Sequence, residues 1–371
     1  MRLPEFALER WFARFEFSVR WNLCASDVEG MGLDELLRLA DPDSRALWND
    51  LTLGYTESAG HPLLRAAIAG LYEKVDPDDV LVCAGAEEAI FLLANALVGP
   101  GDRAVCVQPA YQSLHEVARA AGAEVVPLDL EPLNGWAPGL DRLAAALGDG
   151  ARAVLVNWPH NPTGALIDRA VFDEIVAMTD AAGATLVCDE VYRLLEHDAG
   201  DRLPAGVEAS ERAVSIGVMS KAFGLAGLRI GWIATHDRAL LGRVAALKDY
   251  TSICSSAPSE ILALIALRAR EAVLGRSRSI VAANLPVLHA FMREHSERLD
   301  WVPPRAGTVA FPRLRDGRPA EGLAERLVAE DGVLVLPGSV FGDAPDRFRI
   351  GFGRRDMPEG LAGLGRFLET L

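Results

Sequence analysis

The alternation of short apolar runs with longer helical stretches constrains the fold of this chain more than any other feature of its sequence. From about Gly60 onward, segments of β-type composition alternate with segments of helical periodicity. The β-type runs are 80–85, 103–108, 153–159, 185–192, 213–218 and 229–235. Strands that alternate with helices in this way predict a mainly parallel sheet flanked by helices.

The texture of the sequence changes after Tyr250. Long helical patterns follow, and then short strand-like segments such as TVAFPRL, GVLVLPG and RFRIGFG. A chain of 371 residues is also long for a single hydrophobic core. We therefore expect an N-terminal arm (1–40) that joins the small domain, a large domain (41–255) and a small α+β C-terminal domain (256–371).

The N-terminal arm predicts a short amphipathic helix that packs on a domain or on a partner subunit. Its apolar face is formed by aromatic and aliphatic side chains: Phe6, Leu8, Phe12, Phe15 and Phe17. Acidic residues interrupt this segment, so it does not resemble a signal peptide.

Charge and cysteine usage exclude several classes of function. The net charge is -15, and Lys and Arg do not cluster, which argues against binding to nucleic acids or anionic membranes. The five cysteines are scattered, without CxxC or paired Cys/His spacing, so we expect reduced thiols, no metal site and a cytoplasmic location. A nucleotide-dependent dehydrogenase is also unexpected, because no GxGxxG follows a strand.

A lysine in Gly-rich surroundings carries the strongest functional signal. Lys221 lies in SKAFGLAGLRIGW, and Arg229 follows eight residues later. Small neighbours let the backbone approach a ligand closely, and apolar surroundings favour the neutral, nucleophilic amine. A lysine that forms an imine with an aldehyde, together with an arginine that binds a phosphate, points to pyridoxal 5'-phosphate.

The ordered set of motifs resembles the class I/II aminotransferases, the fold-type-I family of pyridoxal-phosphate enzymes, from about Asn22 to the C-terminus. The set includes Asn161 in HNPTG, and Asp189 and Tyr192 in CDEVY. The resemblance implies a large domain with a mainly parallel seven-stranded sheet and a smaller α+β domain. It also implies that Asp189 pairs with the pyridine nitrogen and that Tyr192 and Asn161 donate to the phenolic oxygen of the ring.

Other cofactor contacts follow from the same resemblance. The turn GAEEAI, which begins at the cofactor-site residue Gly85, would place the main-chain N–H groups of Ala86 and Glu87 at a helix N-terminus that receives the phosphate. Tyr111 in QPAYQSL corresponds to the aromatic residue that stacks on the ring. The family usually has a hydroxyl three residues before the lysine, where this chain has Val218; Ser220 is the candidate replacement.

The resemblance also implies a homodimer with composite active sites. Tyr55 in LGYTESAG resembles the tyrosine that reaches the phosphate bound by the neighbouring subunit. The small-molecule site would then need two chains.

On the substrate side, Arg349 in RFRIGFG resembles the arginine that binds the α-carboxylate of an amino acid, and it fits the motif better than Arg347 or Arg354. The N-terminal part resembles a subgroup that includes capreomycidine synthase and related enzymes that cyclise hydroxylated arginine. In that subgroup acidic and hydroxyl groups hold the guanidinium, which suggests substrate roles for Glu9, Ser26 and Tyr250.

Three functions follow, in order of preference. The first is an aminotransferase acting on an α-amino acid/α-keto acid pair, with Lys221 carrying the proton and Asp189 stabilising the intermediate. The second uses the same cofactor for elimination and cyclisation of a hydroxylated, arginine-like amino acid. The cofactor residues are common to both, so they do not separate them. A non-enzymatic, cofactor-sensing regulator is third, and it would carry a DNA-binding segment that we do not expect here.

Overall fold

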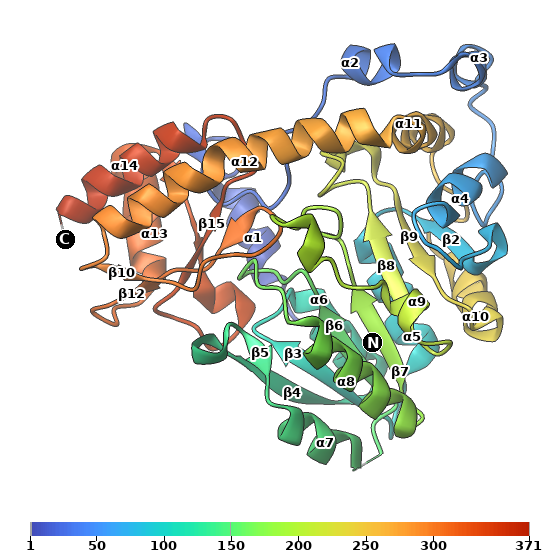
Figure 1. Ribbon diagram of the computed structural model, residues 1–371, viewed down its shortest axis with the longest axis horizontal. Helices are drawn as coiled ribbons and strands as arrows, with labels where there is room; N and C mark the ends of the chain where they lie inside the picture. Colours follow the sequence, from blue (N-terminus) through green and yellow to red (C-terminus); the bar gives the residue numbers. More distant parts are fainter. Residues whose placement is uncertain (1, 149, 371) are drawn as a thin grey trace.

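The computed structural model describes residues 2–148 and 150–370, with a large sheet at its centre (Figure 1). The strand order is β2-β9-β8-β7-β6-β3-β4-β5. Strands β3, β4, β6, β7 and β8 are parallel, β9 is antiparallel to both of its neighbours, and β5 is antiparallel to β4. The predicted mainly parallel sheet is confirmed, and a two-residue edge strand is added to the expected seven. The bounds are β2 Val80–Cys83, β3 Arg103–Gln108, β4 Glu124–Glu131, β5 Ala137–Pro138, β6 Ala153–Asn157, β7 Thr185–Asp189, β8 Val214–Val218 and β9 Gly231–Ala234.

Helices cover both faces of this sheet, which is why its strands are apolar on both sides. In β7, Leu186 and Cys188 pack in the core that contains α8, whereas Val187 packs in the core that contains α5. Helices α5, α6 and α10 lie on one face, and α7 and α8 lie on the other. The helices of this region are α2 Leu33–Arg38, α3 Pro42–Asn49, α4 Pro62–Ala69, α5 Ala86–Leu97, α6 Gln112–Ala121, α7 Leu140–Gly148, α8 Arg169–Ala181, α9 Gly206–Ala209 and α10 Arg238–Lys248.

The C-terminal part combines long helices with short strands, as its sequence predicts. Strands β11, β15 and β14 form a three-stranded sheet, and β1 near the N-terminus pairs in parallel with β13. This pairing joins the N-terminal arm to the C-terminal elements; the exact domain boundaries stay a prediction. The elements are β1 Trp21–Asn22, α11 Ala257–Arg268, α12 Arg270–Glu294, β10 Leu299–Asp300, β11 Val309–Ala310, β12 Arg313–Leu314, α13 Ala320–Asp331, β13 Val333–Leu334, β14 Leu336–Pro337, β15 Phe348–Gly351 and α14 Met357–Glu369.

The N-terminal helix α1 (Ala7–Phe15) lies between the sheet and the C-terminal elements (Figure 1). Its Ala7 N–H donates to the Gln112 side chain at 2.9 Å, and Arg14 forms an ion pair with Glu325 at 2.9 Å. The expected apolar face is partly wrong. The helix ends before Phe17, which is 95% exposed, and Trp11, which is not among the expected apolar residues, is buried.

The parallel strands end at one edge of the sheet, where a ligand site is expected in this architecture. The register pairs Asn157, the last residue of β6, with Asp189, the last residue of β7. Val218 ends the neighbouring strand β8. Polar side chains from separate parts of the sequence therefore meet at this edge.

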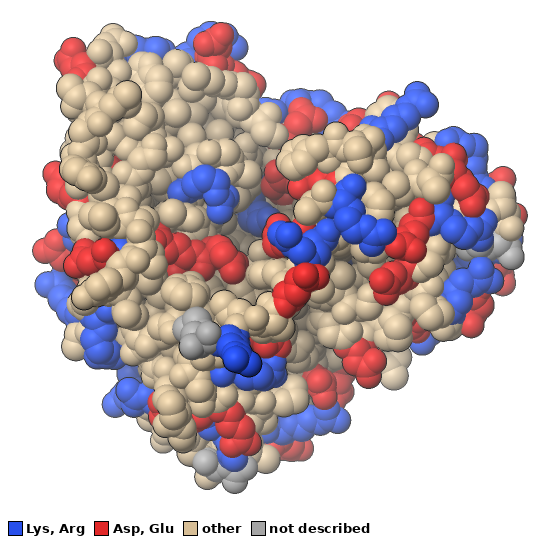
Figure 2. Space-filling view, turned by 180° about the vertical axis from the view of Figure 1, so that it is seen from behind, with Lys and Arg blue, Asp and Glu red and all other residues tan. Residues whose placement is uncertain are grey.

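The outer surface carries mixed charge. Figure 2 shows acidic and basic side chains interspersed over one face, whose outline is indented between two lobes. Within residues 2–148 and 150–370, no helix combines the length and apolarity needed to cross a membrane.

Candidate active site

A cavity of about 330 Å³ opens at the carboxyl edge of the sheet. Its walls come from the strand ends, from the N-terminal segment with α1, and from β15. The size suits a small-molecule site. The predicted site residues that line it are Glu9, Ser26, Ala86, Glu87, Tyr111, Asn161, Asp189, Tyr192, Ser220, Lys221, Arg229 and Arg349.

Lys221 projects into this cavity from the loop that follows β8. Its Nζ donates to the Ser26 hydroxyl at 2.7 Å and lies 5.7 Å from the centre of the Tyr192 ring. Burial lowers the pKa of Lys221 to about 8, although the nearby Asp27 opposes the shift. A large fraction of the amine is therefore neutral, and hence nucleophilic, at mildly alkaline pH.

Asp189 lies at the end of β7 and is also buried against the cavity. The Val191 N–H donates to its Oδ1 at 3.2 Å. Burial raises the pKa of this carboxyl to about 7, and the hydrogen bond from Val191 and the charge of Lys221 oppose the shift. A cationic N–H group that entered the cavity would stabilise the ionised carboxylate and pair with it.

Asn157 connects the two strand ends, and sequence reasoning missed it. Its side-chain amide donates to the Asp189 carbonyl at 2.9 Å, and its Oδ1 accepts from the Asn161 N–H at 2.8 Å. Asn157 thus fixes the HNPTG loop relative to β7. Its position as the last residue of an apolar strand, in register with Asp189, is the signal that could have found it.

Arg349 comes from β15 and is only 1% exposed. Its guanidinium donates to Asn161 Oδ1 at 2.9 Å and to the Cys24 carbonyl at 2.8 Å. Its Nε has no protein partner within the described part of the chain. A buried planar fork of this kind is suited to a carboxylate. The alternatives Arg347 and Arg354 lie outside the cavity lining.

A glycine and an arginine form a corner suited to an anion. Gly85, at the N-cap of α5, has a φ of +86°, and a Cβ there would lie 2.6 Å from Arg229 Nη2. Glycine thereby lets the Arg229 guanidinium approach the helix N-terminus, where free N–H groups begin at Ala86. Val218 and Ser220 both line this cavity. Val218 has no hydroxyl group, and Ser220 supplies one to the cavity wall.

The N-terminal wall of the cavity carries three acidic side chains. Glu9 of α1, Glu16 at the C-cap of this helix and Asp27 line the cavity, and the Tyr111 hydroxyl donates to Glu9 Oε1 at 3.5 Å. Burial raises the pKa of Glu16. Sequence reasoning missed Glu16 and Asp27; once α1 is known, the helical spacing from Glu9 through Phe12 to Glu16 is the signal that could have found the former.

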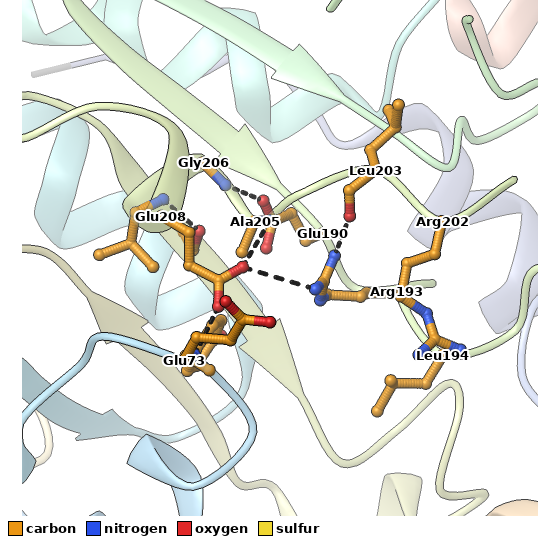
Figure 3. Close-up of polar contacts among 12 residues, drawn as sticks. Glu73, Glu190, Arg193, Leu194, Arg202, Leu203, Ala205, Gly206 and Glu208 are labelled. Atoms are coloured by element: carbon orange, nitrogen blue, oxygen red, sulfur yellow. Dashed lines mark hydrogen bonds and ion pairs between the residues drawn. The ribbon is translucent and has the colours of Figure 1, made fainter. Parts of the chain in front are cut away.

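The Asp189 segment is held from behind by a buried polar network (Figure 3). Glu190 points away from the cavity and accepts the Gly206 N–H at 2.6 Å. Arg193 Nη1 donates to the Leu203 carbonyl at 2.6 Å, and Arg193 Nη2 lies 3.7 Å from Glu208 Oε2. Burial raises the pKa of Glu190 to about 7. The two consecutive carboxyl groups therefore point in opposite directions. Asp189 faces the cavity, and Glu190 belongs to the network that supports it.

Tyr55 and Tyr250 lie outside the cavity of their own chain, and each side chain is 90% exposed. Their segments are neighbours: Ser58 Oγ donates to Asp249 Oδ1 at 3.3 Å, and Thr56 Oγ1 donates to the Ser255 carbonyl at 3.4 Å. The predicted role of Tyr55 involves a second chain and stays a prediction. The structure does not bring Tyr250 into the cavity of its own chain, so its role toward the substrate also stays a prediction.

Comparisons with known proteins agree with this geometry. Residues 21–362 match the family described as aminotransferase class I and II. The chain belongs to this family. It is 36% identical to capreomycidine synthase of Streptomyces vinaceus, over 99% of this chain and 95% of that protein. It is 29% identical to the arginine–pyruvate transaminase of Pseudomonas aeruginosa, over 85% and 84% of the two chains.

Solved structures give the same result. A PLP-dependent aminotransferase from Streptococcus suis superposes with a TM-score of 0.94 and 29% identity, covering 100% of this chain and 99% of the other. The PLP-dependent cyclase OrfR superposes with a TM-score of 0.89 and 31% identity, covering 100% and 98%. The chain is therefore a PLP-dependent enzyme with the fold of these transferases.

The residues of the cavity fit pyridoxal phosphate. The Gly85–Arg229 corner, which a Cβ would fill, suits the phosphate, and the buried Asp189 carboxyl suits a protonated ring nitrogen. Lys221 supplies the amine that an aldehyde requires. The Tyr192 hydroxyl donates to the Ser26 carbonyl at 2.9 Å in this structure, so the expected bond to the phenolic oxygen stays a prediction.

Proposed function

We propose that this enzyme is an aminotransferase for an α-amino acid with a basic side chain. Arg349 binds the substrate α-carboxylate, and Lys221 carries the proton released at the substrate Cα. Asp189 keeps the ring nitrogen of the cofactor protonated. Bound pyridoxal phosphate supplies the aldehyde that takes up the amino group and the ring that accepts the electron pair left at Cα.

The distribution of charge in the cavity supports the substrate class. Arg349 and Lys221 are basic, whereas Glu9, Glu16 and Asp27 form an acidic wall of the same cavity. An amino acid with a carboxylate at one end and a cation at the other would satisfy both parts. The similarity to an arginine–pyruvate transaminase supports this substrate class.

A second function is supported by a separate observation. Similarity to capreomycidine synthase extends over 99% of the chain, and the cyclase OrfR is similar over its whole length. In this alternative the same residues hold the substrate, but a hydroxyl leaves its side chain as water and the guanidinium closes a ring. The acidic wall would orient the guanidinium in either reaction.

Single-turnover spectroscopy with a panel of amino acids separates the two functions. The panel includes alanine, aspartate, arginine and hydroxyarginine, and the products are identified by mass spectrometry. For an aminotransferase, we expect conversion of the cofactor to its pyridoxamine form with arginine, and reversal by an α-keto acid. A dehydrated cyclic product from hydroxyarginine, with no pyridoxamine formed, would reject transamination in favour of cyclisation.

We further propose a cytoplasmic homodimer with composite sites. Exposed apolar side chains on the two neighbouring segments, Leu53, Tyr55, Tyr250 and Ile253, support a subunit contact there. The five unpaired cysteines agree with a reducing compartment.

Mixed dimers test the composite site. A Tyr55→Ala chain mixed with a Lys221→Ala chain should regain activity, because each heterodimer has one site with both residues. A monomer of full activity in analytical ultracentrifugation at micromolar concentration would overturn the dimer.

A further inference from the structure

The hydroxyl of Ser26 is aimed at the reacting amine rather than at open space in the cavity. Lys221 Nζ donates to Ser26 Oγ at 2.7 Å, a short bond between groups that are 195 residues apart in the sequence. Both side chains line the cavity. Ser26 therefore contacts Lys221 directly, whereas the sequence suggested a role toward the substrate.

The backbone around Ser26 is fixed from two sides. The Ser26 carbonyl accepts the Tyr192 and Thr308 hydroxyls, each at 2.9 Å. On the other side, a Cβ at Gly351 would collide with the carbonyl of the residue before Ser26, and a Cβ at Gly353 would collide with that of the residue after it. The hydroxyl is thus placed by a clamped segment.

A neutral hydroxyl has different consequences from a carboxylate at this position. Asp27, the next residue, acts to raise the pKa of Lys221, as a nearby negative charge must. Ser26 Oγ accepts an N–H of the amine and carries a proton that it can donate in turn. It can therefore hold the amine while favouring the ammonium form less strongly than a second carboxylate would.

We propose that Ser26 is the positioning residue for Lys221. Ser26 Oγ would hold the free Lys221 amine in the cavity, at the position from which Lys221 would carry the substrate proton. A lysine side chain that is not held in this way can adopt many rotamers. This inference rests on the proposed role of Lys221 and applies equally to transamination and cyclisation.

The first test follows the titration of Lys221 itself. The full chain, with its cofactor removed, is treated with formaldehyde and cyanoborohydride across a pH series, and methylation of the Lys221 peptide is measured by mass spectrometry. Ser26→Ala should lower the pH midpoint by about half to one pH unit, because a bond from an ammonium is stronger than one from an amine. Ser26→Thr should keep the wild-type midpoint.

Thr308→Val is the matched control, since it removes a hydroxyl that holds the same segment but does not contact Lys221. An unchanged midpoint in both Ser26→Ala and Ser26→Gly, or an equal shift in Thr308→Val, would overturn the proposal. In the holoenzyme, Ser26→Ala should lower kcat about tenfold with KM for the amino donor within about twofold; a change in KM alone would assign Ser26 to substrate binding instead.

The proposed role of Lys221 is tested separately, by locating the cofactor after borohydride reduction. If the cofactor is fixed to a different lysine, the proposed function fails at its first step. If it is fixed to Lys221 and the Ser26 variants titrate like wild type, only the positioning role fails.

Discussion

The two walls of the cavity are built in different ways. At the sheet edge, Asn157 and Asp189 end the neighbouring strands β6 and β7, and Lys221 follows the next strand, β8. Backbone pairing sets the positions from which these side chains project. The N-terminal wall consists of α1 and a segment without regular structure that carries Ser26 and Asp27. Residues at the strand ends can keep the same cofactor chemistry, while residues on a wall from another part of the chain can determine which substrate binds. This difference predicts that variants of the sheet edge abolish chemistry and that variants of the acidic side chains on the N-terminal wall change selectivity.

The largest effect is expected for Lys221→Ala. Removal of the amine should lower kcat by roughly 10³-fold or more, because both covalent attachment and proton transfer are lost. Borohydride reduction should then no longer fix the cofactor to the chain, as mass spectrometry of the intact protein would show. Lys248→Ala is a poor control because that lysine is buried; Lys74→Ala, on the surface, should leave attachment intact. A reducible attachment in Lys221→Ala would place the chemistry on another lysine.

A second prediction compares the two consecutive carboxyl groups at the end of β7. Burial raises the pKa of Asp189 and of Glu190 to about 7 each. The folded protein then binds more protons than the unfolded chain between about pH 4 and pH 7, so the free energy of unfolding of the cofactor-free protein should fall as pH rises through this window. Each group should contribute on the order of a few kcal/mol to this loss.

Urea denaturation at pH 5 and pH 7.5 measures that loss. Asp189→Asn and Glu190→Gln should each reduce the difference in stability between the two pH values. Only Asp189→Asn should also weaken cofactor binding, because Glu190 points away from the cavity. Equal loss of cofactor affinity in both variants would contradict this division of roles.

Arg349→Lys should lower kcat/KM for every α-amino acid substrate by roughly 10- to 100-fold. A lysine cannot reproduce the two-pronged bond of a guanidinium to a carboxylate. Steady-state kinetics with arginine and with a neutral amino acid should show losses of similar size. Arg347→Lys is the matched control, because Arg347 does not line the cavity. If kcat/KM fell only for arginine, Arg349 would act on the substrate side chain rather than on the α-carboxylate.

The smallest effect is expected on the N-terminal wall. Glu16→Gln should raise KM for arginine about tenfold, as expected for the loss of one charge-assisted bond, and should change KM for a neutral amino acid by less than about twofold. Glu174→Gln, on the exposed side of α8, is the control. A uniform loss for both substrates would show that α1 supports the fold of the site rather than its selectivity.

The sequence by itself determined the sheet and the cofactor chemistry. Apolar runs of strand length specify a sheet buried on both faces, and the residues that end those runs, such as Asp189, are carried to one edge by the parallel arrangement. Lys221 and Arg229 could be predicted from the chemistry of their short motif between two strands, and Asn161 from the resemblance of HNPTG to the family motif.

Only the tertiary structure decided what those residues face. Glu16 and Asp27 belong to none of the motifs identified in the sequence, and the contact between Ser26 and Lys221 joins positions 195 residues apart. The placement of α1 likewise depends on contacts with distant segments, at Gln112 and Glu325. Local propensity and periodicity determine elements, but contacts between distant segments depend on how those elements pack, and that packing supplies the wall we propose to select the substrate.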